Sequence, residues 1–183
     1  MKKQLVACCL LSVTCCFFSF SSGTNDETAD AKQKMISQID SINKMMFDKK
    51  SMELDKNLAF KGMTAYQDFV KKYPDDTLSP EYLFRLSDLQ RAVGDNGKAI
   101  ESLAQICKNY PAYKKIPECL FLQGYYYQEF FKDTVSAKGF YQELISKYPT
   151  HAFTDDAKAL MNMFGKSEED IIKDFEKKQK EKS

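Results

Sequence analysis

Residues 99–111 read Ala-Ile-Glu-Ser-Leu-Ala-Gln-Ile-Cys-Lys-Asn-Tyr-Pro, and this stretch decides the fold because the chain carries a copy of its pattern on either side. The three copies align on their Tyr-Pro pairs, Tyr73-Pro74, Tyr110-Pro111 and Tyr148-Pro149, which lie 37 and 38 residues apart. A period in this range is typical of solenoid proteins, in which each repeat is one supersecondary unit stacked on the next.

Each copy has the apolar spacing of an α-helix ahead of its tyrosine. Apolar or small residues stand four, seven and eleven positions before the tyrosine, and these offsets place them on one helical face. In that order they are Phe69, Ile106 and Leu144, then Tyr66, Leu103 and Tyr141, then Gly62, Ala99 and Ala137. The small residue lets a neighbouring helix approach closely. The proline ends the helix because it disfavours helical geometry in the residue before it.

A second helix is predicted to begin six residues after each proline, at Pro80, Pro117 and Asp155. Proline suits the first helical turn, and Glu81 and Glu118 favour the positive end of the helix dipole. Polar breakers separate this helix from the next copy of the first pattern. The predicted fold is therefore an all-α solenoid of antiparallel helical hairpins, with about three units and a C-terminal capping helix.

The hairpin pattern between residues 62 and 165 resembles that of the tetratricopeptide repeat family. The matching positions are Leu83, Leu86, Ser87, Ala99, Leu103 and Pro111, then Leu120, Gly124, Tyr127, Ala137, Tyr141 and Pro149. The chain departs from the family pattern in having no Trp, in its longer period, and in carrying Gln90 and Gln123 where large residues are expected. The resemblance implies a non-enzymatic scaffold for protein–protein interaction.

The long linker that follows each Tyr-Pro pair is similar to the repeats of envelope proteins in Gram-negative bacteria. Two such families are the repeat lipoprotein of the outer-membrane β-barrel assembly machinery and the periplasmic coordinator of the Tol-Pal system. The first similarity implies an outer-membrane assembly role, and the alternative implies coordination of envelope or cell-division processes. The coordinator family has a trimeric coiled coil ahead of its repeats. The apolar stripe from Met35 to Met46 is short for that purpose, which favours the first interpretation.

Residues 1–22 have the organisation of a secretory signal peptide. A basic start with Lys2 and Lys3 precedes an apolar run from Leu5 to about Phe20, and small polar residues follow it. The run is too short to span a bilayer comfortably. Removal of this segment would change the formal net charge from +1 to about −1, a balance that gives no indication of nucleic-acid binding.

Four of the six cysteines lie in this leader, and Cys16 is the candidate for lipidation. The triplet Val13-Thr14-Cys15 fits a bacterial lipoprotein signal loosely, since Gly, Ala or Ser is usual before the acylated cysteine. Ordinary cleavage near Ser19–Gly23 is the competing interpretation, and both remain open. Either one predicts a protein of the cell envelope, in the periplasm or on the periplasmic face of the outer membrane. A lipid on Cys16 would be its only membrane contact, and ordinary cleavage would remove it.

The rest of the chain divides into three predicted segments. Residues 23–30 are small, polar and acidic and are expected to form a flexible tether, residues 31–176 the helical domain, and residues 177–183 a frayed polar tail. Ahead of the repeats, a helix is predicted from an apolar stripe formed by Met35, Ile39, Ile42 and Met46. We expect this stripe to pack on the helix that ends at Tyr73, and a coiled-coil seam to a partner is the alternative.

Enzymatic chemistry finds little support in the sequence. The single histidine, His151, is expected in a loop with no marked nucleophile nearby, and a zinc site would need more ligands. No glycine-rich phosphate loop occurs. We therefore predict no catalytic residue, metal site or cofactor. Cys107 and Cys119 lie outside the leader; we interpret them as buried small residues, with a disulfide across the turn as the open alternative.

The family resemblance also implies a binding groove. Tetratricopeptide repeats line their inner groove with the second, fifth, ninth and twelfth residues of the first helix of each hairpin. Carried onto the matching positions, these are Glu81, Phe84, Asp88 and Arg91, then Glu118, Phe121, Tyr125 and Gln128. Aromatic side chains flanked by charges suit the binding of a protein segment. Packing between stacked hairpins is the alternative for Phe84 and Phe121, whereas Arg91 and Tyr125 favour the groove. The protein is expected to be a monomer or part of a complex.

Overall fold

A computed structural model describes residues 24–46 and 54–180 of the chain. These residues form eight α-helices and no β-strand. None of these helices is long and apolar enough to cross a membrane. The predicted signal peptide, residues 1–22, lies outside the described residues, and so does the candidate lipidation residue Cys16.

The chain divides into two compact units, Met1–Lys34 and Met35–Ser183, and the division falls within helix α1 (Thr24–Met45). The described part of the first unit is the beginning of α1. The sequence predicted a flexible tether over residues 23–30, whereas the structure is helical from Thr24 onward. Acidic residues near the start of α1 and the alanines that follow favour a helix. The prediction of a tether gave more weight to the small and polar composition than to this helix propensity.

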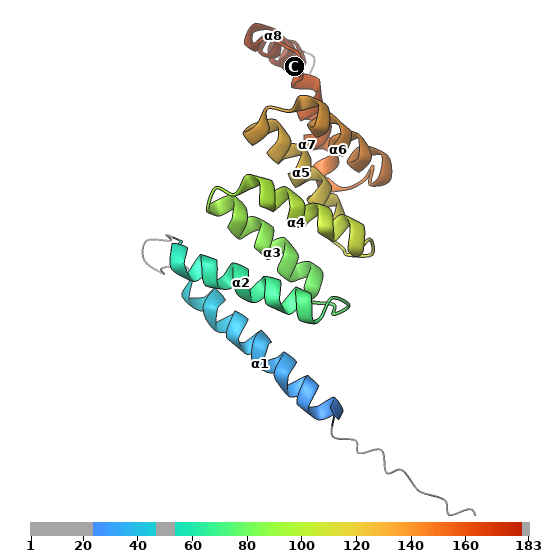
Figure 1. Cartoon of the computed structure of the whole chain (residues 1–183). Helices are drawn as coiled ribbons and strands as arrows, with labels where there is room; N and C mark the ends of the chain where they lie inside the picture. The colour runs from blue at the N-terminus through green and yellow to red at the C-terminus, as the bar shows by residue number, and fades with distance from the viewer. Residues whose placement is uncertain (1–23, 47–53, 181–183) are drawn as a thin grey trace, which may run out of the picture. The chain divides into compact units, whose positions relative to one another are not determined.

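The second unit is a series of helices, of which those from α2 to α7 pack consecutively on one another (Figure 1). After α1 they are α2 (Lys56–Lys72), α3 (Ser79–Ala92), α4 (Asn96–Asn109), α5 (Ile116–Phe131), α6 (Thr134–Lys147), α7 (Ala152–Met163) and α8 (Glu168–Lys180). Each helix from α2 to α6 packs extensively on the next, and α5 also contacts α7. Short turns join α3 to α4 and α5 to α6 as antiparallel hairpins. The predicted all-α solenoid of helical hairpins is therefore confirmed.

The Tyr-Pro pairs end their helices as predicted. The backbone N–H groups of Tyr73, Tyr110 and Tyr148 each donate to the carbonyl oxygen four residues earlier. Each tyrosine carbonyl then accepts the N–H three residues later, which turns the chain in the same way at every linker. The hydroxyls of Ser79 and Thr154 also donate to the carbonyls of Tyr73 and Tyr148. These turns account for the long period of the repeat.

Two helix boundaries differ from the sequence prediction. Helix α7 begins at Ala152 rather than at Asp155, because the side chain of His151 accepts a hydrogen bond from the N–H of Phe153 and caps the helix without a proline. Helix α8 continues to Lys180, past the predicted start of the tail at residue 177. The hydroxyl of Ser167 accepts the N–H of Asp170 and so caps the start of α8.

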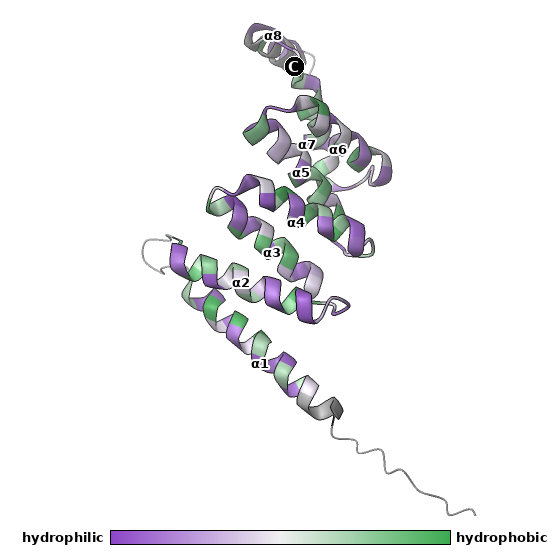
Figure 2. Cartoon of the chain, viewed as in Figure 1, coloured by the Kyte–Doolittle hydropathy of each residue, from purple (hydrophilic) through white to green (hydrophobic). Residues whose placement is uncertain are grey.

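The hydrophobic core lies between consecutive helices. The repeated small residues Ala99 and Ala137 are fully buried, and so are Leu103, Ile106 and Leu144 from the same stripes. Figure 2 shows that the packed helices each carry both hydrophobic and hydrophilic residues, as amphipathic helices do. The helical stripe read from the sequence is therefore the face that builds the core.

The apolar stripe ahead of the repeats also packs inside the second unit. Ile39 and Met46 are each only 2 % exposed. A Cβ atom placed on Gly62 of α2 would lie 2.7 Å from the terminal methyl of Met46 and 3.6 Å from a methyl of Ile42. The hydroxyl of Tyr66 in α2 donates to Asn43. The predicted packing on α2 is confirmed for this part of the stripe.

Candidate partner-binding surface

The predicted groove residues lie on the first helices of the two hairpins, α3 and α5. We name them together the first-helix surface, which consists of Phe84, Asp88, Arg91, Phe121, Tyr125 and Gln128. Asp88, Arg91 and Tyr125 are exposed, and the other three side chains are partly buried. None of the six is fully buried, although Phe84 and Phe121 pack against the edge of the core. Binding of a partner at these residues stays a prediction.

Glu81 is the centre of a hydrogen-bond network at the edge of this surface. The Glu81 carboxylate accepts hydrogen bonds from Arg85 Nε at 3.1 Å, Lys115 Nζ at 3.0 Å and the Tyr113 hydroxyl at 2.6 Å. Desolvation alone would raise the pKa of Glu81, but these three hydrogen bonds together lower it to about 2. Desolvation and the Glu81 carboxylate raise the pKa of Tyr113. The network ties α3 to the linker that precedes α5.

Lys115 has a second contact in this network. Its ammonium nitrogen lies 4.5 Å from the centroid of the Phe84 ring, in a cation–π arrangement. The Lys115 side chain therefore covers Phe84 while its charge is paired with Glu81. For Phe84, the structure favours packing by the chain itself over an open groove position.

The next repeat places different residues at the equivalent positions. Glu118 takes the place of Glu81, and His151 Nε2 lies 3.8 Å from a Glu118 carboxylate oxygen that is buried without a hydrogen-bond partner in the described structure. Phe121 takes the place of Phe84, and the ring of Phe153 stacks on it with centroids 4.7 Å apart. One repeat therefore covers its phenylalanine with a lysine and the other with an aromatic ring.

The aromatic cluster of α5 is split between core and surface. Tyr126 is 1 % exposed, and burial raises its pKa to about 12. Tyr127, a position of the family pattern, is partly buried against the core and stacks on Phe140. Tyr125 is 38 % exposed, and its ring lies parallel to that of Phe121. Tyr125 is thus the aromatic residue that the first-helix surface presents to solvent.

Two hollows adjoin the first-helix surface. The α5–α7 hollow, about 390 Å³, is lined by Phe121, Leu122, Tyr125, Asp156, Ala159 and Leu160. A second hollow of about 330 Å³ lies beside α3, and its lining is Asn43, Met46, Tyr66, Arg85, Asp88 and Leu89. Desolvation raises the pKa of Asp88, and the nearby charges of Arg91 and Lys115 partly offset this effect. The predicted groove residues thus border both hollows.

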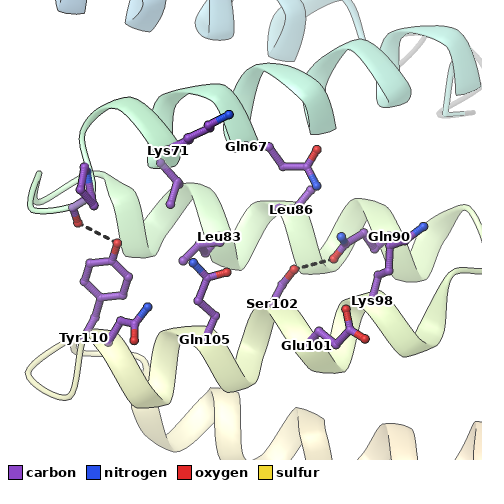
Figure 3. Close-up of a pocket in the computed structure, with 13 residues that line it drawn as sticks. Gln67, Lys71, Leu83, Leu86, Gln90, Lys98, Glu101, Ser102, Gln105 and Tyr110 are labelled. Atoms are coloured by element: carbon purple, nitrogen blue, oxygen red, sulfur yellow. Dashed lines mark hydrogen bonds between the residues drawn. The ribbon is translucent and has the colours of Figure 1, made fainter.

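A larger hollow, about 480 Å³, was not predicted from the sequence (Figure 3). Its side chains come from α2, α3 and α4, and many of them are polar, among them Gln67, Lys71 and Gln105. Within it Ser102 donates to the side-chain oxygen of Gln90 at 2.8 Å, as Figure 3 shows. Its polar members, such as Gln67 and Gln105, do not belong to the repeated pattern, so the pattern did not indicate this hollow.

Cys107 and Cys119 face each other across the α4–α5 linker as free thiols. A hydrogen bond with Cys107 and burial both raise the pKa of Cys119, which is fully buried. Gln123 donates to Cys107 Sγ at 3.6 Å and to the carbonyl oxygen of Cys119. The described residues contain no cluster of three or more His, Cys, Asp or Glu side chains that could hold a metal ion.

A protein-family model described as tetratricopeptide repeat matches residues 81–113 and 118–151. These segments are tetratricopeptide-type hairpins. The first match spans α3 and α4, and the second spans α5 and α6. Tetratricopeptide repeats generally mediate protein–protein interactions and typically form non-enzymatic scaffolds. A comparison with curated proteins finds no match to the chain.

Proposed function

We propose that this protein is a non-enzymatic scaffold of the bacterial cell envelope that binds a segment of another protein on the first-helix surface. The observation that carries the proposal is that two successive repeats present Arg91 and Tyr125 to solvent, with Tyr125 at one hollow and Asp88 at the other. Partly exposed aromatic and arginine side chains are the residue types that most often anchor protein interfaces.

The cellular location in this proposal rests on residues 1–22, which have the organisation of a signal peptide. Between the two envelope roles that the Tyr-Pro linkers suggest, we prefer outer-membrane assembly. The burial of Ile39 and Met46 in the second unit supports this preference, because buried side chains are not free to form a coiled-coil seam. A stable trimer in solution would instead favour the Tol-Pal-like coordinator.

Photo-crosslinking from the native envelope tests the binding site. A photoreactive amino acid at position 125 is expected to capture a partner, and the double variant Arg91→Ala with Tyr125→Ala is expected to lose that partner while its circular dichroism stays helical. A matched control places the same amino acid at exposed Lys108 on α4. A folded double variant that keeps every partner would overturn the proposed site.

Anchoring is tested separately with Cys16→Ser. If Cys16 carries a lipid, this variant should leave the membrane fraction for the soluble fraction without a change in unfolding midpoint, because the residue lies outside the helical domain. Several acyl chains hold a protein firmly, whereas one chain gives only marginal membrane binding. Wild-type protein found wholly in the soluble fraction would contradict lipidation and leave the binding proposal intact.

A further inference from the structure

The α5–α7 hollow combines an apolar wall with one charged group. Five of its six lining residues are apolar or aromatic, and Asp156 is the single charged one. The Asp156 side chain is exposed and makes no hydrogen bond or ion pair within the described structure. Its neighbour Asp155, by contrast, is paired with Lys158 at 3.0 Å and does not line the hollow. The hollow therefore has one unpaired negative charge at an aromatic surface.

The protein already shows what such a combination binds. In the preceding repeat, the ammonium group of Lys115 lies over the Phe84 ring and pairs with the Glu81 carboxylate. An aromatic face and a carboxylate together bind a basic side chain, because the ring attracts the cation and the carboxylate pairs with its charge. That site is filled by the chain's own lysine.

The α5–α7 hollow lacks such a lysine. At the position equivalent to Lys115 the chain has Phe153, which covers one face of Phe121. Tyr125 stacks beside Phe121 and remains 38 % exposed. The aromatic surface and the Asp156 carboxylate are both present here, and no cationic residue among those that the structure describes lines the hollow.

We propose that the α5–α7 hollow receives a lysine or arginine side chain of the protein segment bound on the first-helix surface. The aliphatic stem of that side chain packs on Tyr125 and Leu160, and its charged end pairs with Asp156. The inference rests on the proposed function and adds the chemistry of the partner, which is a segment with a basic residue.

Selection of peptides tests this inference without knowledge of the natural partner. The full chain is immobilised and used to select from a random heptapeptide display library, and we expect the recovered peptides to be enriched in Lys or Arg. For a synthetic recovered peptide, Asp156→Asn is expected to weaken binding about fivefold, as loss of a partly exposed charge pair would. Replacing the peptide's basic residue by norleucine should weaken wild-type binding equally and remove the effect of Asp156→Asn.

The matched control is Asp155→Asn, which removes an adjacent exposed carboxylate outside the hollow and is expected to leave the affinity unchanged. Circular dichroism confirms that each variant is folded. Peptides without basic enrichment, or with the same affinity for Asp156→Asn and wild type, would overturn the basic-residue inference. If Tyr125→Ala still abolished their binding, the proposed function would stand. Failure to recover any peptide would count against both.

Discussion

At the scale of single residues, Gly124 lies in close contact with Tyr141. A Cβ atom on Gly124 would lie 2.6 Å from Tyr141 Cε1, an atom of a rigid ring that is fully buried. We therefore expect Gly124→Ala to lower the free energy of unfolding by about 1–3 kcal/mol through overpacking. Urea unfolding followed by circular dichroism measures this loss.

Gly62→Ala is the matched control for this prediction. The Cβ atom would lie 2.7 Å from the terminal methyl of Met46, which is the end of a flexible side chain and can turn away. The higher helix propensity of alanine, worth about 1 kcal/mol, offsets the cost of that movement. The unfolding free energy should stay nearly unchanged. Equal losses in the two variants would show that contact with Tyr141 is not the cause.

The Glu81 network predicts a dependence of stability on pH. The pKa of Glu81 falls from an ordinary 4.5 to about 2 in the folded protein, so its contribution to stability is present above pH 4.5 and is lost as the pH falls toward 2. In Glu81→Gln this component should disappear, which flattens the decline of the urea midpoint over that range. Glu101→Gln, at an exposed residue outside the network, should follow the wild type.

The sequence predicts the buried residues better than it predicts this network. Ala99 and Ala137 could be assigned to the core because their spacing from the Tyr-Pro pair is fixed by a single helix. Lys115 and Tyr113 lie 34 and 32 residues from Glu81, and their contacts depend on how one hairpin stacks on the next. No local pattern contains that information.

At the scale of helices and turns, aspartates cap the second helix of each hairpin. Asp133 accepts hydrogen bonds from the N–H groups of Val135 and Ser136 and from the Ser136 hydroxyl. Asp133→Ala should lower the unfolding free energy by about 1 kcal/mol, the usual cost of losing such a cap. Asp133→Asn keeps an acceptor and should lose less. An Ala variant as stable as wild type would mean that solvent replaces the cap without cost.

Helix ends marked by a Tyr-Pro pair were predicted correctly, whereas the start of α7 was not. Pro80 and Pro117 mark the starts of α3 and α5 in the sequence, but α7 has no proline at its start and is capped by His151. Histidine is not among the residue types that usually cap helices, so this cap becomes visible only through its hydrogen bond. The sequence therefore predicts element order and type here more reliably than boundaries.

At the scale of the whole second unit, stability is built from contacts between consecutive helices. Helix α8 takes no part in the extensive helix–helix contacts of the described residues. A chain that ends at Lys166 should therefore change its Tm by less than about 2 °C, the shift that about 0.5 kcal/mol produces in a domain of this size. A larger drop on thermal unfolding would show that α8 acts as the predicted capping helix.

The partner is the property that the sequence and the fold specify least. The repeat pattern defines a scaffold and the positions of α3 and α5 that are not fully buried, because both follow from helical periodicity. The hollow that contains Asp156 depends on the packing of α7 against α5. Its unpaired negative charge depends on contacts in the folded chain, in which Asp155 pairs with Lys158 and Asp156 lines the hollow.

The Tyr110 hydroxyl donates to the carbonyl oxygen of Pro74 at 2.7 Å and so joins two successive linkers 36 residues apart. Tyr148, the equivalent residue of the next repeat, makes no such bond to Pro111 in the described structure. In mechanical terms, this hydrogen bond braces the first junction on one side, and the second junction lacks it. We therefore expect a load that bends the stack away from this side to open the junction at Tyr148 before the junction at Tyr110.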